Sequence, residues 1–327
     1  MTRSLQVVEE TFPIAGSFTI SRGSRTEIPV ISVTIIEGEN MGSGECVPYA
    51  HYGESLSSVR RQIENMSALI ADGGDRADLN TAMPAGAARN AIDCALLDLE
   101  AKQTGRRAWE ILDLLPPPEL VTAYTLSLGS AEAMGAAARG ARERTLLKLK
   151  LGGAGDVERV RAVREGAPNS RLIVDANEAW SQDMVQPFSE AFAEMGVELI
   201  EQPLPSGHDE LLAAIPHPVP ICADESCHVS SDLNNLTGRY DLVNIKLDKT
   251  GGLTEALNLA RAARAKGFDI MVGCMLGTSL AMAPAILVAT LADFVDLDGP
   301  LLLSKDRDEP LVYRNSHVMP PEPELWG

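Results

Sequence analysis

The sequence predicts an α/β protein in which a modified (β/α)7β barrel of the TIM type follows an α+β capping domain made of a three-stranded meander and helices. Three observations predict this fold. Short apolar runs alternate with helical stretches from Val121 to about residue 300. Several of these runs end in an ionisable residue, and 22 to 26 residues separate consecutive ends. The 327 residues also suffice for a barrel of roughly 200 to 250 residues and a smaller domain.

The capping domain is expected to span residues 1–118. Its strands are predicted where β-branched residues are frequent, over residues 4–10, 28–37 and 43–47. Residues 16–25 interrupt this pattern and are predicted to form a loop. Apolar residues at helical spacing predict helices over 55–70 and 84–103. Three consecutive prolines at 116–118 cannot continue a helix, so they mark the end of the domain.

The barrel domain is expected to span residues 119–300, with seven or eight parallel strands. Its helices are predicted over residues 131–143, 155–166, 182–196, 209–214, 230–237, 252–266 and 278–291. The tail, residues 301–327, contains four prolines. We expect it to pack back across the capping domain rather than extend the barrel.

Composition narrows the class of protein. The net charge of −18 argues against nucleic-acid and membrane partners, since nucleic acids and anionic membranes both need a basic surface. The longest apolar window, about thirteen residues from Leu280, is too short for a membrane span of about 20. Acids at Glu9 and Glu10 stand where a signal peptide has its apolar core, and five cysteines form no Cys-x-x-Cys pair. These features predict a cytoplasmic protein with reduced thiols.

Ionisable residues recur at the ends of otherwise apolar runs. They are Lys150, Asp175, Glu201, Asp224 and Lys246. Buried charges are costly, so these side chains need a common destination that stabilises them. Parallel barrel strands deliver their last residues to one mouth, where three carboxylates and several lysines would converge.

The three carboxylates, Asp175, Glu201 and Asp224, form an all-oxygen set that suits a hard cation. Mg²⁺ is expected before Mn²⁺, one ion per subunit, with coordination positions left for water and substrate. Local salt bridges are the alternative for any one acid. Glu178 and Glu225 lie close in sequence and are candidates for supporting roles.

Lys148 and Lys150 lie two apart on one strand, so they share a face. Repulsion between them is expected to lower the pKa of at least one, which would give the neutral amine that a general base requires. A solvated pair is the alternative. Strand alternation also turns Lys246 inward with Asn244 and Asp248, and leaves Lys249 as a loop residue. Lys150 and Lys246 would then approach a substrate from opposite sides, as inversion of a stereocentre needs.

Together these motifs resemble the muconate-lactonising branch of the enolase superfamily. The resemblance rests on Lys148-x-Lys150, Asp175-Ala-Asn, Glu201-Gln-Pro, Ala-Asp224-Glu-Ser and Asn-Ile-Lys246-Leu-x-Lys-x-Gly-Gly. Gly44-Glu45 and the segment 84–99 also resemble the capping domain of that family, so the resemblance covers nearly the whole chain. Within the branch, the sequence most resembles the L-Ala-D/L-Glu (dipeptide) epimerases of peptidoglycan recycling.

The resemblance implies a Mg²⁺-dependent 1,1-proton transfer that interconverts L-Ala-D-Glu and L-Ala-L-Glu through an enediolate at the glutamate α-carbon. Lys150 and Lys246 would be the acid and base catalysts. Lys148 would bind the substrate carboxylate with the metal, and Thr125 and Cys274 would line the pocket.

Two further features of the resemblance concern the ends of the dipeptide. Asp296-Leu-Asp298 resembles a clamp for its ammonium group, the physical complement of two acids on one face. The segment with Arg22 and Arg25 resembles a mobile loop that closes on the distal side chain. Either arginine could pair with the glutamate carboxylate, and Arg25 is favoured.

Several alternatives stay open at this point. The same site could serve a lyase that resembles o-succinylbenzoate synthase or muconate cycloisomerase, an epimerase of other dipeptides, or a catalytically silent metal-binding protein. A homo-oligomer is compatible with the sequence. Members of the family often have an acid after the seventh strand, whereas this chain has Met275-Leu-Gly277, which leaves the supporting contacts there open.

Overall fold

The computed structural model describes residues 2–327 and opens with a three-stranded antiparallel sheet in the order β1-β2-β3. The strands are β1 (Ser4–Ile20), β2 (Gly23–Glu37) and β3 (Asn40–Cys46). The prediction of a loop over residues 16–25 is therefore wrong, because Phe18, Thr19 and Ile20 continue the pairing with β2. The register of the pairing shifts between Pro13 and Phe18, around Gly16, which has φ 90°. This irregularity inside the hairpin interrupts the strand pattern in the sequence, and such an interruption by itself predicts a loop.

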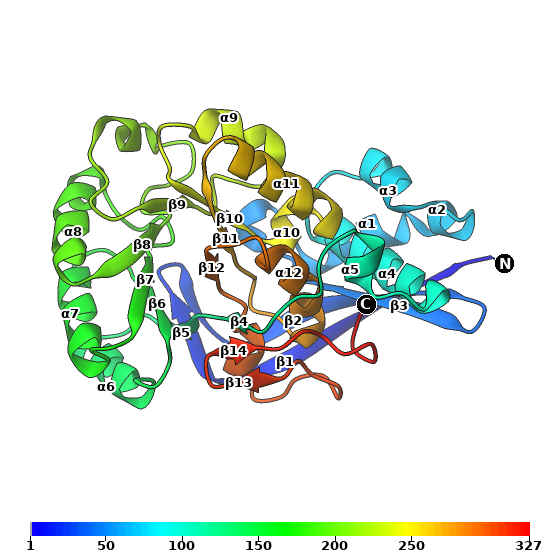
Figure 1. Cartoon of the computed structure of the whole chain (residues 1–327), viewed down its shortest axis with the longest axis horizontal. Helices are drawn as coiled ribbons and strands as arrows, with labels where there is room; N and C mark the ends of the chain where they lie inside the picture. The colour runs from blue at the N-terminus through cyan, green and yellow to red at the C-terminus, as the bar shows by residue number, and fades with distance from the viewer. Residues whose placement is uncertain (1) are drawn as a thin grey trace.

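This long hairpin reaches from the capping domain toward the barrel strands (Figure 1). The helices of the domain are α1 (Leu56–Glu64), α2 (Ser67–Ala71), α3 (Arg76–Ala82), α4 (Ala87–Thr104) and α5 (Ala108–Ile111). The single helix predicted over 55–70 is broken into α1 and α2, and α3 was not predicted. Helix α4 packs closely on β3, since a Cβ at Gly44 would lie 2.1 Å from the Ala91 carbonyl oxygen.

Eight parallel strands form one curled sheet in the order β5 to β12, which confirms the predicted barrel class. The strands are β5 (Tyr124–Leu126), β6 (Leu146–Lys150), β7 (Arg171–Asp175), β8 (Val197–Glu201), β9 (Ile221–Ala223), β10 (Leu242–Ile245), β11 (Asp269–Val272) and β12 (Phe294–Val295). A backbone hydrogen bond from Ala123 N to Val295 O, 2.8 Å long, joins the two ends of the sheet.

Helices connect consecutive strands. They are α6 (Ala131–Gly140), α7 (Asp156–Gly166), α8 (Gln182–Glu194), α9 (Leu233–Leu236), α10 (Leu247–Thr250), α11 (Leu253–Ala265) and α12 (Ser279–Ala289). The helix predicted over 209–214 is a 3₁₀ helix, η2 (Glu210–Ala214), and the one predicted over 230–237 divides into η3 (Ser230–Asp232) and α9.

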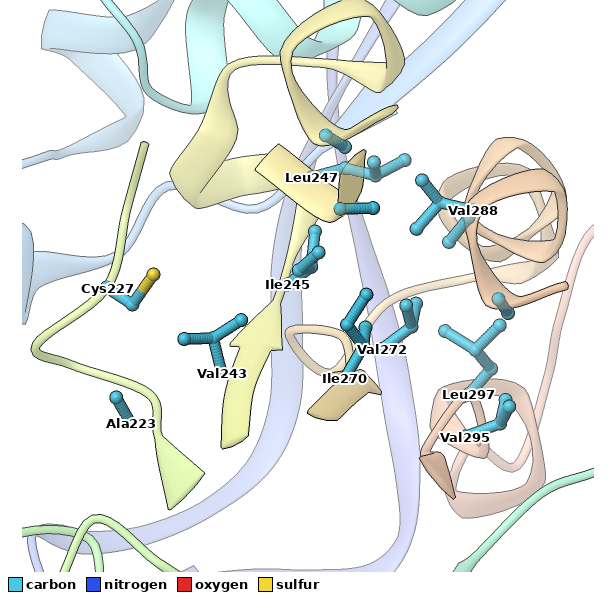
Figure 2. Packing of buried hydrophobic residues seen from close by; sticks show 14 of the residues in the cluster. Ala223, Cys227, Val243, Ile245, Leu247, Ile270, Val272, Val288, Val295 and Leu297 are labelled. Atoms are coloured by element: carbon cyan, nitrogen blue, oxygen red, sulfur yellow. The ribbon is translucent and has the colours of Figure 1, made fainter. Parts of the chain in front are cut away.

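Alternation along the strands separates two cores. On the outer face, Val243 and Ile245 of β10 and Val272 of β11 belong to the same buried cluster as Val288 of α12 (Figure 2). Alternate residues form a separate inner cluster: Ala123, Leu146, Ile173, Leu199, Cys222, Leu242 and Met271. Because strand side chains repeat every two residues, the inner positions two or four residues further on fall at the C-terminal mouth, where the chain carries its ionisable residues.

The tail runs back toward α4 and α5 (Figure 1). It contains η4 (Gly299–Leu302), β13 (Tyr313–Arg314) and β14 (His317–Val318), and β14 pairs with β4 (Leu120–Val121). Trp326 is fully buried and donates from Nε1 to the Cys94 carbonyl of α4. The domain boundary at residue 118 stays a prediction. Across residues 2–327, no helix is both long and apolar enough to cross a membrane.

Candidate active site

The register of the parallel strands places the charged residues at the same height along the barrel axis. Lys150 pairs with Asp175 across β6 and β7, and Asp175 pairs with Glu201 across β7 and β8. Asp224 directly follows β9, and Lys246 directly follows β10. The five strand-end residues predicted from the sequence therefore meet at one mouth of the barrel, and all five are buried.

Lys148 lies between three acids. Its Nζ is 2.6 Å from Glu201 Oε2, 2.7 Å from Asp296 Oδ2 and 3.4 Å from Asp175 Oδ2. Burial by itself would lower the pKa of Lys148, but the charges of the acids, Asp296 first, outweigh burial and raise the pKa well above its usual value. The sequence predicts that repulsion lowers the pKa of at least one lysine of the pair, and Lys148 is not that lysine, because carboxylates surround its ammonium group.

Lys150 and Lys246 each hold one acid and line one cavity of about 510 Å³. Lys150 Nζ lies 2.6 Å from Asp175 Oδ2, and Lys246 Nζ lies 2.6 Å from Asp224 Oδ2. For Lys246, burial would lower the pKa, and the charges of Asp224 and then Glu201 reverse this and raise it. Both catalysts proposed from the sequence thus open on the same space from opposite parts of the sheet.

The three acids respond differently to their surroundings. Burial would raise the pKa of Asp175, but Lys150 and Lys148 together lower it to about 2. The pKa of Asp224 lies well below its usual value, because Lys246 and Lys249 outweigh the effect of burial. The pKa of Glu201 is raised, first by burial and then by the charge of Asp175. Glu201 is therefore the acid with the least charge compensation.

One oxygen of each acid is held by a group that the sequence analysis did not assign to the site. The Asn177 backbone N–H donates to Asp175 Oδ1 at 2.9 Å, Asn244 Nδ2 to Glu201 Oε1 at 2.7 Å, and Lys249 Nζ to Asp224 Oδ1 at 2.7 Å. Asn177 has φ 45°, a left-handed conformation that asparagine tolerates better than most residues.

Two positions near Lys246 differ from expectation. Lys249 is not a loop residue but lies buried on the short helix α10, because the chain turns into a helix directly after β10. Asp248 does not share the inward face. Its Oδ1 accepts hydrogen bonds from Val47 N and Asn90 Nδ2 of the capping domain.

The acids fit a hard cation in chemical type and in their order on the strands, although Lys148 and Lys246 stand between them. Asp175, Glu201 and Asp224 come from three neighbouring strand ends and offer only oxygen. Buried Glu201 Oε2 contacts the Lys148 ammonium but accepts no hydrogen bond from any of the described residues, 2–327. With ammonium groups in this space, the side chains of residues 2–327 form no group of three His, Cys, Asp or Glu at metal-binding spacing.

The predicted clamp lies beside this cluster. Asp296 Oδ2 accepts a hydrogen bond from Lys148, while its buried Oδ1 has no hydrogen-bond partner in the part of the chain that the structure describes. Asp298 Oδ2 accepts the Thr125 backbone N–H at 2.6 Å, and burial together with the Asp296 charge raises the pKa of Asp298 to about 7. Cys274 lines the cavity, whereas Thr125 is buried next to Asp298.

The two candidate arginines at the hairpin tip have different surroundings. Arg22 is engaged within the protein, with Nη2 2.8 Å from Glu225 Oε1 and 3.0 Å from the Tyr49 hydroxyl, and Nη1 3.1 Å from Glu178 Oε2. Arg25 lines the cavity and forms no ion pair within residues 2–327. Arg25 is therefore the arginine left available to a ligand.

Sequence reasoning missed an aromatic part of the cavity wall, formed by Tyr49, His51 and Tyr52 with Phe18 from the hairpin. A signal was present, because the chain has only five tyrosines and five histidines and three of these ten residues fall within positions 49–52. The Phe18 ring centroid lies 5.9 Å from Lys150 Nζ, so the hairpin covers that amine with an apolar group.

Comparison with models of protein families gives two matches that together span most of the chain. Residues 2–113 match the mandelate racemase / muconate lactonizing enzyme N-terminal domain. Residues 131–324 match the enolase C-terminal domain-like family.

Two relatives of established activity cover nearly the whole chain. The L-Ala-D/L-Glu epimerase of Escherichia coli K12 is 45% identical over 97% of this chain and 99% of its own length. The N-acetyl-D-glutamate racemase of a Pseudoalteromonas species is 47% identical over 91% of this chain and 95% of its own length.

Solved structures agree with these relatives. An enolase family member from Agrobacterium tumefaciens with homology to dipeptide epimerases, solved with sodium, L-Ala-L-Glu and an ordered loop, superimposes with a TM-score of 0.98 at 56% identity, covering 99% of this chain and all of that one. A dipeptide epimerase from Methylococcus capsulatus, complexed with Mg and L-Arg-D-Lys, gives a TM-score of 0.91 at 30% identity, covering 100% and 99%.

These relatives are named as epimerases and racemases, and the strand-end acids and lysines form one site in the same fold, so the protein is an enzyme of the isomerase class. The chain belongs to the mandelate racemase / muconate lactonizing enzyme family of the enolase superfamily, in the branch that contains the dipeptide epimerases.

Proposed function

We propose that the protein is a Mg²⁺-dependent epimerase that interconverts L-Ala-D-Glu and L-Ala-L-Glu at the glutamate α-carbon. The observation that carries this proposal is the placement of Lys150 and Lys246. They come from β6 and the end of β10, with β7, β8 and β9 between them, and both line one cavity. Two amines on opposite sides of a bound α-carbon can each reach one face of it.

The proton transfer balances with these two residues. One lysine, as the neutral amine, takes the α-proton, and the C–H electron pair moves into the adjacent carboxylate. The other lysine, as the ammonium, delivers a proton to the opposite face, which inverts the centre. The roles exchange in the reverse direction. The hairpin residue Phe18 limits water around Lys150.

The α-proton of a carboxylate is too weak an acid for an unaided amine. Asp175, Glu201 and Asp224 would hold a divalent cation, which when bound supplies positive charge toward the substrate carboxylate. Lys148, fixed between Glu201 and Asp296, would donate to the same carboxylate. The Mg in the Methylococcus capsulatus structure supports the choice of cation for this chain.

Charged groups beside Lys148 and on the hairpin fit the two ends of the dipeptide. Asp296 contacts Lys148, and its buried Oδ1 accepts no hydrogen bond from residues 2–327, so an ammonium group would satisfy it. Arg25 at the opposite, hairpin side would pair with the glutamate side-chain carboxylate. A role in murein peptide recycling in the cytoplasm is part of this proposal, and the name of the E. coli relative, L-Ala-D/L-Glu epimerase, supports the substrate.

A second candidate is racemisation of N-acetylglutamate, favoured by the 47% identical relative from Pseudoalteromonas. Both substrates are N-acylated glutamates with the same reacting carbon. They differ at the acyl end, where L-Ala carries an ammonium group and acetyl carries none. Substitution of Asp296 or Asp298 is therefore expected to affect the first function more than the second.

Incubation with L-Ala-D-Glu and MgCl₂ in deuterated water tests the proposal. The proton NMR signal of the glutamate α-proton is expected to disappear as L-Ala-L-Glu forms, and excess EDTA should stop both processes. Absence of exchange with the cation present would refute the proposal. The variant Asp296→Asn should lower kcat/KM for L-Ala-D-Glu by about ten-fold more than for N-acetyl-D-glutamate, as loss of one charge-assisted hydrogen bond to the ammonium group predicts. A loss that arises from the contact between Asp296 and Lys148 should affect both substrates equally. If the wild-type protein turns over N-acetyl-D-glutamate faster than L-Ala-D-Glu, the second candidate function is favoured instead.

A further inference from the structure

The two oxygens of each proposed cation ligand have different partners. Asp224 shows this most clearly, because Lys246 Nζ contacts Oδ2 at 2.6 Å while Lys249 Nζ contacts Oδ1 at 2.7 Å. Glu201 is divided in the same way, with Asn244 Nδ2 on Oε1 at 2.7 Å and Lys148 on Oε2 at 2.6 Å. In both acids, one oxygen contacts a lysine of the site at 2.6 Å, and the other accepts a hydrogen bond from Lys249 or Asn244. Glu201 Oε1 also lies 3.9 Å from Lys246 Nζ.

All hydrogen-bond donors of the Lys249 ammonium group are used within the protein. It is 1% exposed, and its ammonium donates three hydrogen bonds, to Asp224 Oδ1, to the Asp224 carbonyl at 2.5 Å and to the Asn244 carbonyl at 2.8 Å. An ammonium has three donors, so Lys249 has none left for a substrate. It does not line the catalytic cavity.

Asn244 is equally enclosed. It is fully buried, it lies on β10 two residues before Lys246, and a Cβ at Gly273 would lie 2.7 Å from its Oδ1. The missing side chain at Gly273 therefore leaves space for the Asn244 amide, which donates from Nδ2 to Glu201 Oε1.

We propose that Lys249 and Asn244 are positioning residues that each fix one oxygen of an acid, so that Asp224 presents Oδ2 and Glu201 presents Oε2 to the cation. The proposal rests on the proposed function, because it concerns the same three acids. It assigns opposite tasks to the two lysines on Asp224. Lys249 orients the ligand, whereas Lys246 occupies the oxygen that the cation needs.

The test measures Mg²⁺ binding by calorimetry, without substrate, for the wild type and for Lys249→Met, Lys246→Met and Asn244→Leu. Lys249→Met is expected to weaken Mg²⁺ affinity by about 10- to 100-fold, as loss of an outer hydrogen-bond partner does at other metal sites. Lys246→Met should bind Mg²⁺ at least as tightly as the wild type, although it loses epimerase activity. Asn244→Leu, which changes no charge, should weaken binding to a similar degree as Lys249→Met.

Simple electrostatics predicts the opposite for Lys249→Met, because removal of a positive charge should tighten the binding of a cation. Unchanged or tighter Mg²⁺ binding by Lys249→Met would therefore overturn its positioning role. Equal weakening by Lys246→Met and Lys249→Met would overturn the division of Asp224 between its two oxygens. The electron paramagnetic resonance spectrum of bound Mn²⁺ gives a second readout, which should change in Lys249→Met and Asn244→Leu.

Folding and the proposed function are checked separately. Circular dichroism without metal should show the same secondary structure for all variants, and Asn244→Leu carries the test if Lys249→Met does not fold. Failure of the wild type to bind Mg²⁺ would count against the proposed function. A wild type that binds Mg²⁺ beside variants that bind it equally well would reject only the positioning roles.

Discussion

Arg22 Nη2 lies 2.8 Å from Glu225 Oε1, and this contact joins the tip of the β1–β2 hairpin to the loop after β9, 203 positions away in sequence. The side chain of Glu225 is 2% exposed and that of Arg22 is 26% exposed. A second ion pair, with Glu178, lies beside it. Arg22 therefore holds the hairpin over the cavity through contacts within the protein, while Arg25 faces the cavity itself.

Replacement of Arg22 by Gln should loosen this closure. We expect KM to rise about ten-fold for both epimers, which corresponds to the loss of ~1.5 kcal/mol from a hydrogen bond between charged groups. Steady-state kinetics with each epimer checks this. Arg60→Gln is the matched control, because Arg60 also pairs with two glutamates but lies on α1 with its side chain 41% exposed. An unaltered KM for Arg22→Gln would contradict a closing role.

Replacement of Arg25 by Gln should change the selectivity for the side chain of the dipeptide rather than the closure of the hairpin over the cavity. We expect kcat/KM for L-Ala-D-Glu to fall by about 10- to 100-fold, the value of a charge-assisted hydrogen bond of ~1.5 to 3 kcal/mol. For L-Ala-D-Gln, which carries no side-chain charge, little change is expected. Parallel kinetics on the two dipeptides give the comparison. Equal losses on both would show that Arg25 does not contact the glutamate carboxylate.

Removal of either catalytic lysine should separate exchange from epimerisation. Lys150→Ala and Lys246→Ala should both lower epimerisation by about 10² to 10⁴, the usual contribution of a general acid or base. Each variant retains one base, so each should still exchange the α-proton of one epimer with deuterated water, and the two variants should prefer opposite epimers. NMR on the separate epimers checks this. Two variants that exchange the same epimer would argue against one base on each face.

The Glu45–Arg307 pair gives a prediction for stability. Arg307 Nη2 of the tail lies 2.6 Å from Glu45 Oε2 of β3, and Glu45 also accepts a hydrogen bond from Thr278 N at the start of α12. Arg307→Met leaves the buried carboxylate without its cation. We expect the free energy of unfolding in urea to fall by about 3 to 5 kcal/mol at neutral pH.

The size of this loss should depend on pH in a defined direction. Burial raises the pKa of Glu45, and Arg307 counteracts part of that effect, so the variant should have a still higher pKa. Below the pKa of an unfolded glutamate, about 4.3, Glu45 is protonated in both states and the charge penalty vanishes. The difference between wild type and Arg307→Met should thus grow as pH rises. In a Glu45→Gln background, the stability loss caused by Arg307→Met should not grow with pH. If the loss still grows with pH in that background, a group other than Glu45 causes the effect.

This network also answers the question raised by Met275-Leu-Gly277. No acid from that loop is needed to support it, since Glu45 reaches the adjacent Thr278 from β3 and Arg307 donates from Nε to the Thr278 hydroxyl at 3.0 Å. Sequence analysis could not find this support, because its three members come from the capping domain, the barrel and the tail. Their proximity depends on how those parts pack.

The site residues on the strands were easier to predict than those beside them. Glu201 and Lys150 follow apolar runs directly, and a buried charge at a strand end has few destinations other than the barrel mouth. Lys249 was misplaced because Gly251 and Gly252 favour a loop, whereas the chain first makes the helical turn α10 and ends it at Gly251 with φ 73°.

The sequence by itself determined the barrel, the strand ends and the types of residue delivered there, because the two-residue period of a strand and the cost of burying charge act locally. Only the tertiary structure decided the pairing. Lys148 meets Asp296 across 148 positions, and the hairpin brings Arg22 to Glu225 across 203. Such contacts are set by strand register, by closure of the sheet and by packing between distant segments, none of which a local pattern encodes.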